Sequence, residues 1–293
     1  MDLQQLRTFT TIAKEGSLSR ASLSLCLSQP AISAQIKALE EELQLKLFNR
    51  SAKGMALTPA GQILLEDATK ALLAANNVST KAQTFRGSGI GGKFKLGTIS
   101  DPKILRLPEF FSVLVSRHSD LKLSLSQGIS GDIIDKVISR EMQAGYVIGN
   151  VEDPRLQSIE TGPITLRIVA PVQWKKKIEH AGWEDIVELP WLSTPAKCSF
   201  RQIARRMFER NGVMPQTVIE ADQETMLSDL VIQGIGLTLL REDVAIAAEQ
   251  DEKIAIWSPG IEIDHLYFVY LREEEDTPLM QAIIAIVKEI WRL

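Results

Sequence analysis

Apolar residues near the amino end recur three or four positions apart in three short segments, residues 1–13, 17–25 and 28–43. This spacing is typical of amphipathic helices, and the last two segments are close enough to be joined by a tight turn. Ser17 and Ser28 are suitable N-caps for the second and third helix. The chain therefore opens with a predicted helix-turn-helix.

The third predicted helix has two contrasting faces. One face is an apolar stripe formed by Ile32, Ile36, Leu39 and Leu43. The other face carries small or polar residues and one cation, namely Pro30, Ser33, Ala34 and Lys37. A helix that enters a DNA major groove needs such a face, because bulky side chains would block its approach and short polar ones reach base edges and phosphates. An ordinary surface helix would show the same pattern, so this stretch alone leaves both interpretations open.

Residues 44–57 are expected to form a β-hairpin wing that packs beside the three helices. Asn49 and Gly54 bracket a turn, and residues 55–57 form a short predicted strand. Arg50 and Lys53 would lie at the tip, where two cations suit the phosphates beside a groove. Either cation by itself fits a solvated loop equally well.

A long helix is predicted from Thr58, an N-cap followed by a proline, to about residue 87. Its apolar positions form a heptad seam: Leu64, Ala68, Ala71, Ala75, Val78, Ala82 and Phe85. Small side chains allow a partner helix to approach closely, and a solitary helix this weakly apolar would be marginal. The seam therefore favours dimerisation, with packing on its own chain as the alternative.

Four glycines between Arg86 and Gly92 end this helix and mark a predicted hinge. Beyond the hinge, strand and helix patterns alternate, which indicates α/β architecture with parallel sheets. Strands are expected at 93–99, 121–127, 144–150, 164–170, 191–194, 216–222, 235–240 and 265–273. Helices are expected at 104–117, 131–142, near 175, 199–210, 223–233 and 278–291. The return of the last strand predicts two lobes, lobe I at about 93–163 and 265–293 and lobe II at about 164–264.

Ligands of open parallel sheets bind outside the carboxyl ends of the strands. This rule places Ser100, Asp101, Gly149, Asn150 and Thr194 at a cleft between the lobes. The predicted helix that begins at residue 199 adds a site for an anion, because its first N–H groups are free. Capping and turn roles account for these residues equally well.

Three stretches resemble the N-terminal domain of LysR-type transcriptional regulators: MDLQQLRTFTTIAKEGSLSRAS, LSQPAISAQIKALEEELQLKLFNR and ALTPAG. The match runs from about residue 2 to 61. Its motif positions are Phe9, Gly16, Ser17, Ala21, Ser28 to Ser33, Leu39, Glu40, Leu47, Phe48, Arg50 and Thr58 to Gly61. The resemblance implies a winged helix-turn-helix domain at 1–60, a linker dimerisation helix at 61–88, and at 89–293 a two-lobed effector-binding domain similar to periplasmic binding proteins.

The resemblance also implies two sets of functional residues. The DNA-binding set is Ser28, Gln29, Pro30, Ser33, Lys37, Arg50 and Lys53. The effector-binding set is Ser100, Asp101, Gly128, Ser130, Gly149, Asn150, Lys197, Cys198, Ser199 and Phe200. Serine and asparagine side chains suit a small polar or anionic metabolite.

Cys198 precedes a predicted helix and lies beside Lys197 and Arg201, features that lower the pKa of a thiol. Peroxide-sensing LysR-type proteins carry a reactive cysteine near this place. Their resolving cysteine, about nine residues further on, is missing here, since Met207 and Phe208 stand there. A cysteine that lines the pocket is therefore favoured over a single-thiol sensor, and Cys26 is expected in the core.

Charge and motif content narrow the classes of function. Residues 1–88 hold ten Lys and Arg against seven Asp and Glu, while the rest of the chain holds 23 against 30. Positive charge thus concentrates at the proposed DNA end. The three histidines are widely spaced, and neither a Gly-x-Ser-x-Gly elbow nor a P-loop occurs, so we expect neither catalysis nor a cofactor.

The chain lacks an apolar run of membrane-spanning length, so a cytoplasmic protein without membrane contact is expected. An enzyme built on the α/β lobes would leave the helix-turn-helix unexplained, and a scaffold would not need a cleft. The sequence therefore predicts a sequence-specific transcriptional regulator that binds double-stranded DNA, a small-molecule effector and further copies of itself, as a homodimer or homotetramer.

Overall fold

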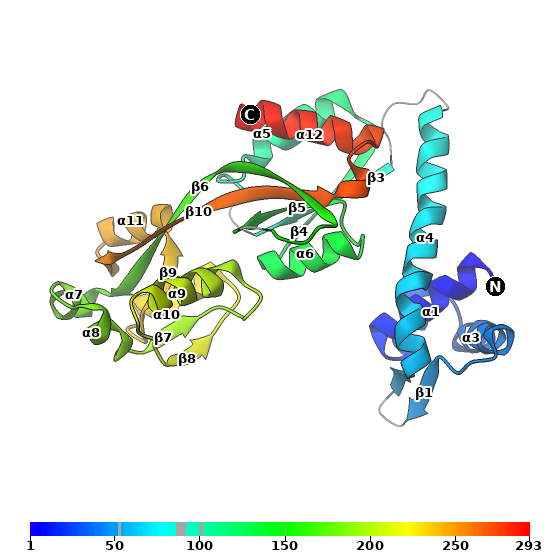
Figure 1. Cartoon of the computed structure of the whole chain (residues 1–293), viewed down its shortest axis with the longest axis horizontal. Helices are drawn as coiled ribbons and strands as arrows, with labels where there is room; N and C mark the ends of the chain where they lie inside the picture. The colour runs from blue at the N-terminus through cyan, green and yellow to red at the C-terminus, as the bar shows by residue number, and fades with distance from the viewer. Residues whose placement is uncertain (52–53, 86–91, 100–101, 150) are drawn as a thin grey trace. The chain divides into compact units, whose positions relative to one another are not determined.

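A computed structural model describes residues 1–51, 54–85, 92–99, 102–149 and 151–293. The chain divides into two compact units, residues 1–89 and 90–293 (Figure 1). Each unit has its own hydrophobic core. The predicted glycine-rich hinge lies outside the described residues, apart from Gly92.

The N-terminal unit consists of helices and one small hairpin. Its elements are α1 (Leu3–Glu15), α2 (Leu18–Leu25), α3 (Gln29–Leu43), β1 (Phe48–Ser51), β2 (Gly54–Leu57) and α4 (Pro59–Phe85). The two strands pair in antiparallel fashion, so the predicted wing is confirmed. The apolar stripe of α3 faces the core, where Phe9 and Phe48 meet edge to face with ring centroids 5.5 Å apart.

Side chains at the helix ends decide where these helices begin. The Ser28 hydroxyl accepts a hydrogen bond from the Ala31 N–H at 3.4 Å, as the sequence predicted. The Thr58 hydroxyl accepts one from the Gly61 N–H at 3.0 Å and starts α4 in the same way. Ser17 precedes α2 but makes no capping hydrogen bond, so that prediction was only half right. Cys26 is exposed rather than buried, because it ends α2 in a left-handed conformation within the turn.

Part of the heptad seam of α4 packs against the N-terminal unit of its own chain. Ala68 is buried, and Leu64 and Ala71 pack against the core of the N-terminal unit. Packing on its own chain, the alternative to dimerisation, is thus correct for the first part of the seam. Val78 is 69% exposed and stays available for a partner helix, while the side chains of residues 79–85 lie outside the description.

The C-terminal unit is an α/β structure. Its strands are β3 (Gly92–Thr98), β4 (Leu121–Gln127), β5 (Ala144–Ile148), β6 (Leu156–Pro171), β7 (Trp191–Ser193), β8 (Thr217–Glu220), β9 (Thr238–Arg241) and β10 (Ile254–Leu271). Its helices are α5 (Leu107–Arg117), α6 (Ser130–Ile138), α7 (Lys175–Ile178), α8 (Trp183–Val187), α9 (Ser199–Arg210), α10 (Glu224–Ile232), α11 (Glu242–Gln250) and α12 (Pro278–Trp291). Two 3₁₀ turns, η1 (Val172–Trp174) and η2 (Arg272–Glu274), follow β6 and β10. Helices α8 and α11 are additions to the sequence prediction.

The main sheet is mixed, which corrects the expectation of parallel sheets. Six strands follow the order β4-β3-β5-β10-β6-β9, with β3 parallel to β4 and β5, and β10 antiparallel to β5 and β6. Strands β6 and β10 are 16 and 18 residues long and run side by side through both lobes (Figure 1). The predicted strands at 164–170 and 265–273 were therefore only parts of them.

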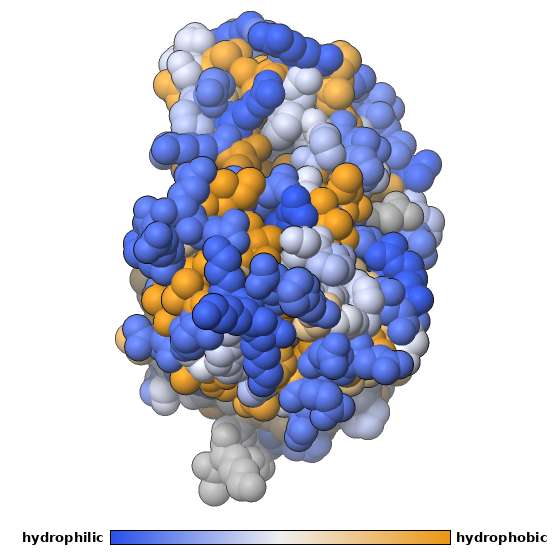
Figure 2. Space-filling model, turned by 90° about the vertical axis from the view of Figure 1, so that its left-hand side faces the viewer, coloured by the Kyte–Doolittle hydropathy of each residue, from blue (hydrophilic) through white to orange (hydrophobic). Residues whose placement is uncertain are grey.

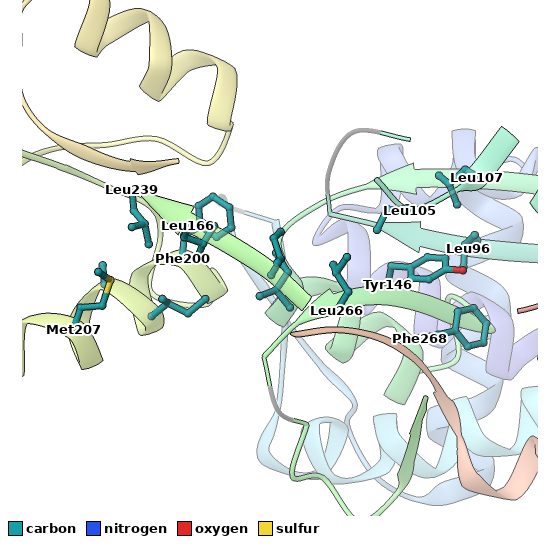
Figure 3. Packing of buried hydrophobic residues seen from close by; sticks show 14 of the residues in the cluster. Leu96, Leu105, Leu107, Tyr146, Leu166, Phe200, Met207, Leu239, Leu266 and Phe268 are labelled. Carbon is teal, nitrogen blue, oxygen red and sulfur yellow. The ribbon is translucent and has the colours of Figure 1, made fainter. Parts of the chain in front are cut away.

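The two lobes share one apolar core along these long strands. Lobe I holds β3–β5 with α5, α6 and α12, and lobe II holds β7–β9 with α7–α11, so both contain a stretch of β6 and β10. Figure 3 shows Leu96, Tyr146 and Phe268 at one end of this core. Leu239 and Met207 lie at its other end. Because one core continues through both lobes, the two lobes are held together along β6 and β10.

The face of the molecule seen in Figure 2 is mostly hydrophilic, and its hydrophobic residues are divided into small patches. Across the part of the chain that the structure describes, no helix combines the length and apolar character needed to span a membrane.

Candidate nucleic-acid interface and ligand cleft

Helix α3 presents the face that the sequence assigned to DNA. Gln29, Pro30 and Lys37 are exposed, and Ser33 is half-buried, while Ile32 and the rest of the apolar stripe face the core. The Lys37 ammonium lies 3.5 Å from the Glu41 carboxylate on the same helix, and both side chains are exposed to solvent. Surface pairs of this kind are worth little, so the lysine is readily released to a phosphate.

The Gln29 amide on α3 donates a hydrogen bond to the Ser19 hydroxyl on α2 at 3.0 Å. This contact orients a predicted DNA-binding side chain at the start of α3. Ser28, another predicted contact, is exposed but already accepts the capping hydrogen bond described above.

Glu40 is a positioning residue for which the sequence suggested no role. Its carboxylate accepts hydrogen bonds from the N–H groups of Leu47 and Phe48, at 2.8 and 3.3 Å, and from the Lys46 ammonium at 2.8 Å. Burial acts to raise the pKa of Glu40, but these hydrogen bonds together outweigh it and lower the pKa. Glu40 therefore ties the start of the wing to α3.

The wing is also fixed to the turn between α1 and α2. The Met55 N–H donates to the Gly16 carbonyl at 2.9 Å. A Cβ atom on Gly54 would lie 2.4 Å from that carbonyl oxygen, and Gly54 has φ +123°, so only glycine suits this position. The predicted contacts Arg50 and Lys53 belong to this hairpin, but the Arg50 side chain and all of Lys53 lie outside the description.

A cleft of about 930 Å³ opens between lobes I and II. Lobe I contributes residues of the β4–α6 connection and of α6, and lobe II contributes the segment before α9, the start of α10 and Arg241. A smaller recess of about 40 Å³ adjoins this cleft and shares Gly128, Ile129, Asp222 and Glu224 with it.

The recess brings together half of the predicted effector-binding set. Its lining includes Gly128, Ser130, Cys198, Ser199 and Phe200. Lys197 lines the outer cleft, where its ammonium pairs with the Asp135 carboxylate at 2.6 Å.

The remaining predicted residues do not join the recess. Gly149 borders neither cavity, and its nearest side chain is that of Asp264. Ser100, Asp101 and Asn150 lie outside the described residues. Asp222 and Glu224 line the recess but were missed, although the strand-end rule applied to β8 would have pointed to Asp222.

Two serines of the predicted set make structural hydrogen bonds. The Ser199 hydroxyl donates to the Ile148 carbonyl at 2.6 Å, and the Ser130 hydroxyl accepts from the Ile148 N–H at 3.2 Å. Both side chains are buried. They fasten the starts of α9 and α6 to the end of β5, so both serines have a structural role alongside their place in the recess, although neither caps its own helix.

The surroundings of Cys198 differ from those of a reactive thiolate. Burial raises the pKa of the Cys198 thiol, and this effect exceeds the lowering by the Thr194 hydroxyl and by the N–H groups of Phe200 and Arg201. The expectation of a lowered pKa was wrong, because the sequence shows the charges nearby but not the burial.

A helix-turn-helix with a wing, joined in one chain to a two-lobed unit with an internal cleft, defines a ligand-responsive DNA-binding regulator. Family comparison makes the class specific. The model of the bacterial regulatory helix-turn-helix protein, lysR family, matches residues 3–62, and that of the LysR substrate binding domain matches residues 87–292. The chain belongs to the LysR family of transcriptional regulators. The predicted family, fold class, function and classes of partner are thereby confirmed.

The individual relatives share less than a third of their residues with this chain. The HTH-type transcriptional regulator YofA of Bacillus velezensis is 28% identical over 240 residues, which are 82% of this chain and 81% of YofA. The crystal structure of CbnR, a LysR family transcriptional regulator, has 19% identity and a TM-score of 0.65, and covers 99% of both chains. Full-length CbnR complexed with its target DNA has a TM-score of 0.63 at 19% identity, covering 100% of this chain and 99% of CbnR.

Proposed function

We propose that α3 reads the operator through Gln29, Pro30, Ser33 and Lys37, with Ser28 at its start and Arg50 and Lys53 of the wing at flanking phosphates. In this proposal the DNA-binding domain covers residues 1–60, the dimerisation helix 61–88 and the effector domain 89–293. The protein acts on chromosomal DNA in the cytoplasm and catalyses no reaction.

The observation that supports DNA reading most directly is the contrast between the two sides of α3. Its exposed side carries one cation among small and polar groups, and its buried side is anchored by Ile32, Ile36 and Leu39. A rigidly held helix with an unbulky outer face meets both requirements for entry into a major groove.

Effector binding is assigned to the recess because both lobes line it. Gly128 and Ser130 belong to lobe I, while Thr194 and Asp222 belong to lobe II. A ligand held by both lobes favours the lobe arrangement in which all of its contacts are made, and so shifts the population of states. In a dimer this shift changes how the two DNA-reading helices are spaced.

The DNA assignment is tested by Lys37→Ala, with Lys70→Ala as the matched control. Each lysine is exposed and forms an ion pair within its own helix, Lys37 with Glu41 and Lys70 with Glu66. Binding is measured by mobility shift on duplexes enriched from a random pool by the wild-type chain. Loss of one phosphate contact should weaken binding across all enriched sequences and reduce the salt slope by about one. Lys70→Ala should behave as wild type, whereas wild-type binding by Lys37→Ala would contradict the assignment.

A further inference from the structure

The charged groups that line the recess are carboxylates. Asp222 follows β8 and Glu224 begins α10, and the described lining contains neither lysine nor arginine. Glu224 is already occupied, since it accepts from the Arg241 N–H at 2.8 Å and lies 3.1 Å from the Arg241 side chain. The Asp222 carboxylate forms neither a hydrogen bond nor an ion pair with any described residue. The Asp222 carboxylate is therefore suited to a positive group of a ligand.

Other groups that line the recess are hydrogen-bond donors, and Thr194 among them follows β7 beside the strand β8 that precedes Asp222. Thr194 is only 5% exposed, and its hydroxyl has no hydrogen-bond partner of ordinary geometry among the described residues, although it lies near the Cys198 thiol. The Ser130 hydroxyl accepts from Ile148, which leaves its own O–H to donate. The recess also meets the starts of α6 and α9, where the helix dipoles favour negative charge.

A buried hydroxyl without a partner is costly, so the Thr194 side chain indicates a polar ligand atom beside it. A dianion would meet these donors but would bring its second charge toward Asp222. A simple amine would pair with Asp222 but would bring its positive charge toward the starts of α6 and α9, where the helix dipoles favour negative charge. A group with both charges, a few ångströms apart, satisfies the hydrogen-bond donors and Asp222 together.

We propose that the effector is a zwitterion of the α-amino acid type. Its carboxylate faces Thr194, Ser130 and the starts of α6 and α9, and its ammonium group faces Asp222 and Glu224. The recess, at about 40 Å³, takes only this head group, and the adjoining cleft of about 930 Å³ takes the side chain. This inference rests on the effector role proposed above and narrows the expected polar or anionic effector to one that carries both charges.

The first test uses the full chain and measures the thermal shift caused by each of the twenty common L-α-amino acids. Every amino acid that stabilises the chain is then compared by calorimetry with its deaminated acid and its decarboxylated amine, as L-leucine with 4-methylpentanoate and 3-methylbutylamine. We expect at least one amino acid to bind and both of its partial analogues to bind at least tenfold more weakly. A panel without a binder, or an acid analogue that binds as tightly as its amino acid, would overturn the proposal.

The second test changes one carboxylate. Asp222→Asn should weaken binding of that amino acid at least tenfold and leave binding of its deaminated acid unchanged or stronger. Asp120→Asn is the matched control, because Asp120 is also an exposed carboxylate of the C-terminal unit and lines neither the recess nor the cleft. Equal loss in both variants, or in neither, contradicts the assigned position of the ammonium group.

A parallel panel of succinate, glutarate and citrate separates this inference from the proposed function. If these dianions and trianions stabilise the chain and the amino acids do not, the chain is a sensor of anions and the zwitterion proposal is wrong. If the anions and the amino acids both leave the melting temperature unchanged while operator binding persists, the zwitterion proposal fails and the DNA-reading assignment stands.

Discussion

The substitution Ser199→Ala distinguishes two possible roles of a side chain that lines the recess. In the structure the Ser199 hydroxyl donates to the Ile148 carbonyl at 2.6 Å, and the side chain is only 6% exposed. If this bond is the main role of Ser199, its removal should lower the stability of the C-terminal unit even without ligand. If Ser199 served only to contact the effector, the variant would keep its stability and lose its response.

The expected loss follows from the burial of the bond. Leaving a buried polar group unpaired costs about 1–3 kcal/mol. Alanine at the start of a helix returns a few tenths of a kcal/mol, roughly 0.5 kcal/mol at most, through its higher helix propensity. The net loss of about 0.5–2.5 kcal/mol should lower the melting temperature by about 1–10 °C in a unit of this size.

Tryptophan fluorescence measures this loss on the full chain. All five tryptophans, Trp174, Trp183, Trp191, Trp257 and Trp291, lie in the C-terminal unit, so their emission reports on that unit alone. Ser116→Ala is the control, because the exposed Ser116 hydroxyl only bonds to the Val113 carbonyl within α5, at 2.9 Å. A melting temperature for Ser199→Ala equal to that of Ser116→Ala would refute the structural role of Ser199.

Two more predictions concern other parts of the chain. With a disulfide reagent at neutral pH, the exposed Cys26 should react quickly and the half-buried Cys198 slowly, because desolvation of the Cys198 thiol raises its pKa. Fast reaction of both thiols in the native protein would contradict this expectation. Glu40→Gln should weaken operator binding and blunt the acid sensitivity of the N-terminal unit, followed by far-ultraviolet circular dichroism. The pKa of Glu40 is lowered on folding, so its stabilisation is present above the unfolded value of 4.5 and is lost as the pH falls through the folded value; identical acid transitions in the variant and wild type would count against it.

The local spacing of apolar residues correctly predicted those helices whose formation depends on residues close together in the sequence. The apolar positions of α3 recur at helical spacing, and Ile32, Ile36 and Leu39 are buried as that spacing requires. Helices α9 and α12 begin and end at the predicted residues. In each case one face of a helix carries nearly all of the apolar side chains, so the period alone identifies the element.

The full lengths of β6 and β10 depend on contacts between residues far apart in the sequence, so the local pattern did not reveal them. The segments before residues 164 and 265 contain Gly162, Pro163, Pro259 and Gly260, which indicate turns when read locally. In the structure they lie within β6 and β10, where the pairing shifts register between Ile256 and Ile261. A Cβ atom on Gly260 would lie 2.6 Å from the Ile168 side chain, so this glycine serves close packing rather than a turn.

The same irregular pairing suggests where the lobes are able to move. Strands β6 and β10 pair along most of their length and carry the shared core, so the lobes cannot separate like two bodies on a flexible tether. A second register shift, between Leu266 and Tyr267, lies near the boundary of the lobes, and the Thr161 hydroxyl donates to the Leu266 carbonyl there at 3.0 Å. Bulges bend and twist a strand pair without breaking it. A ligand that bridges the recess therefore acts against the bending stiffness of two paired strands, which favours small changes of the angle between the lobes.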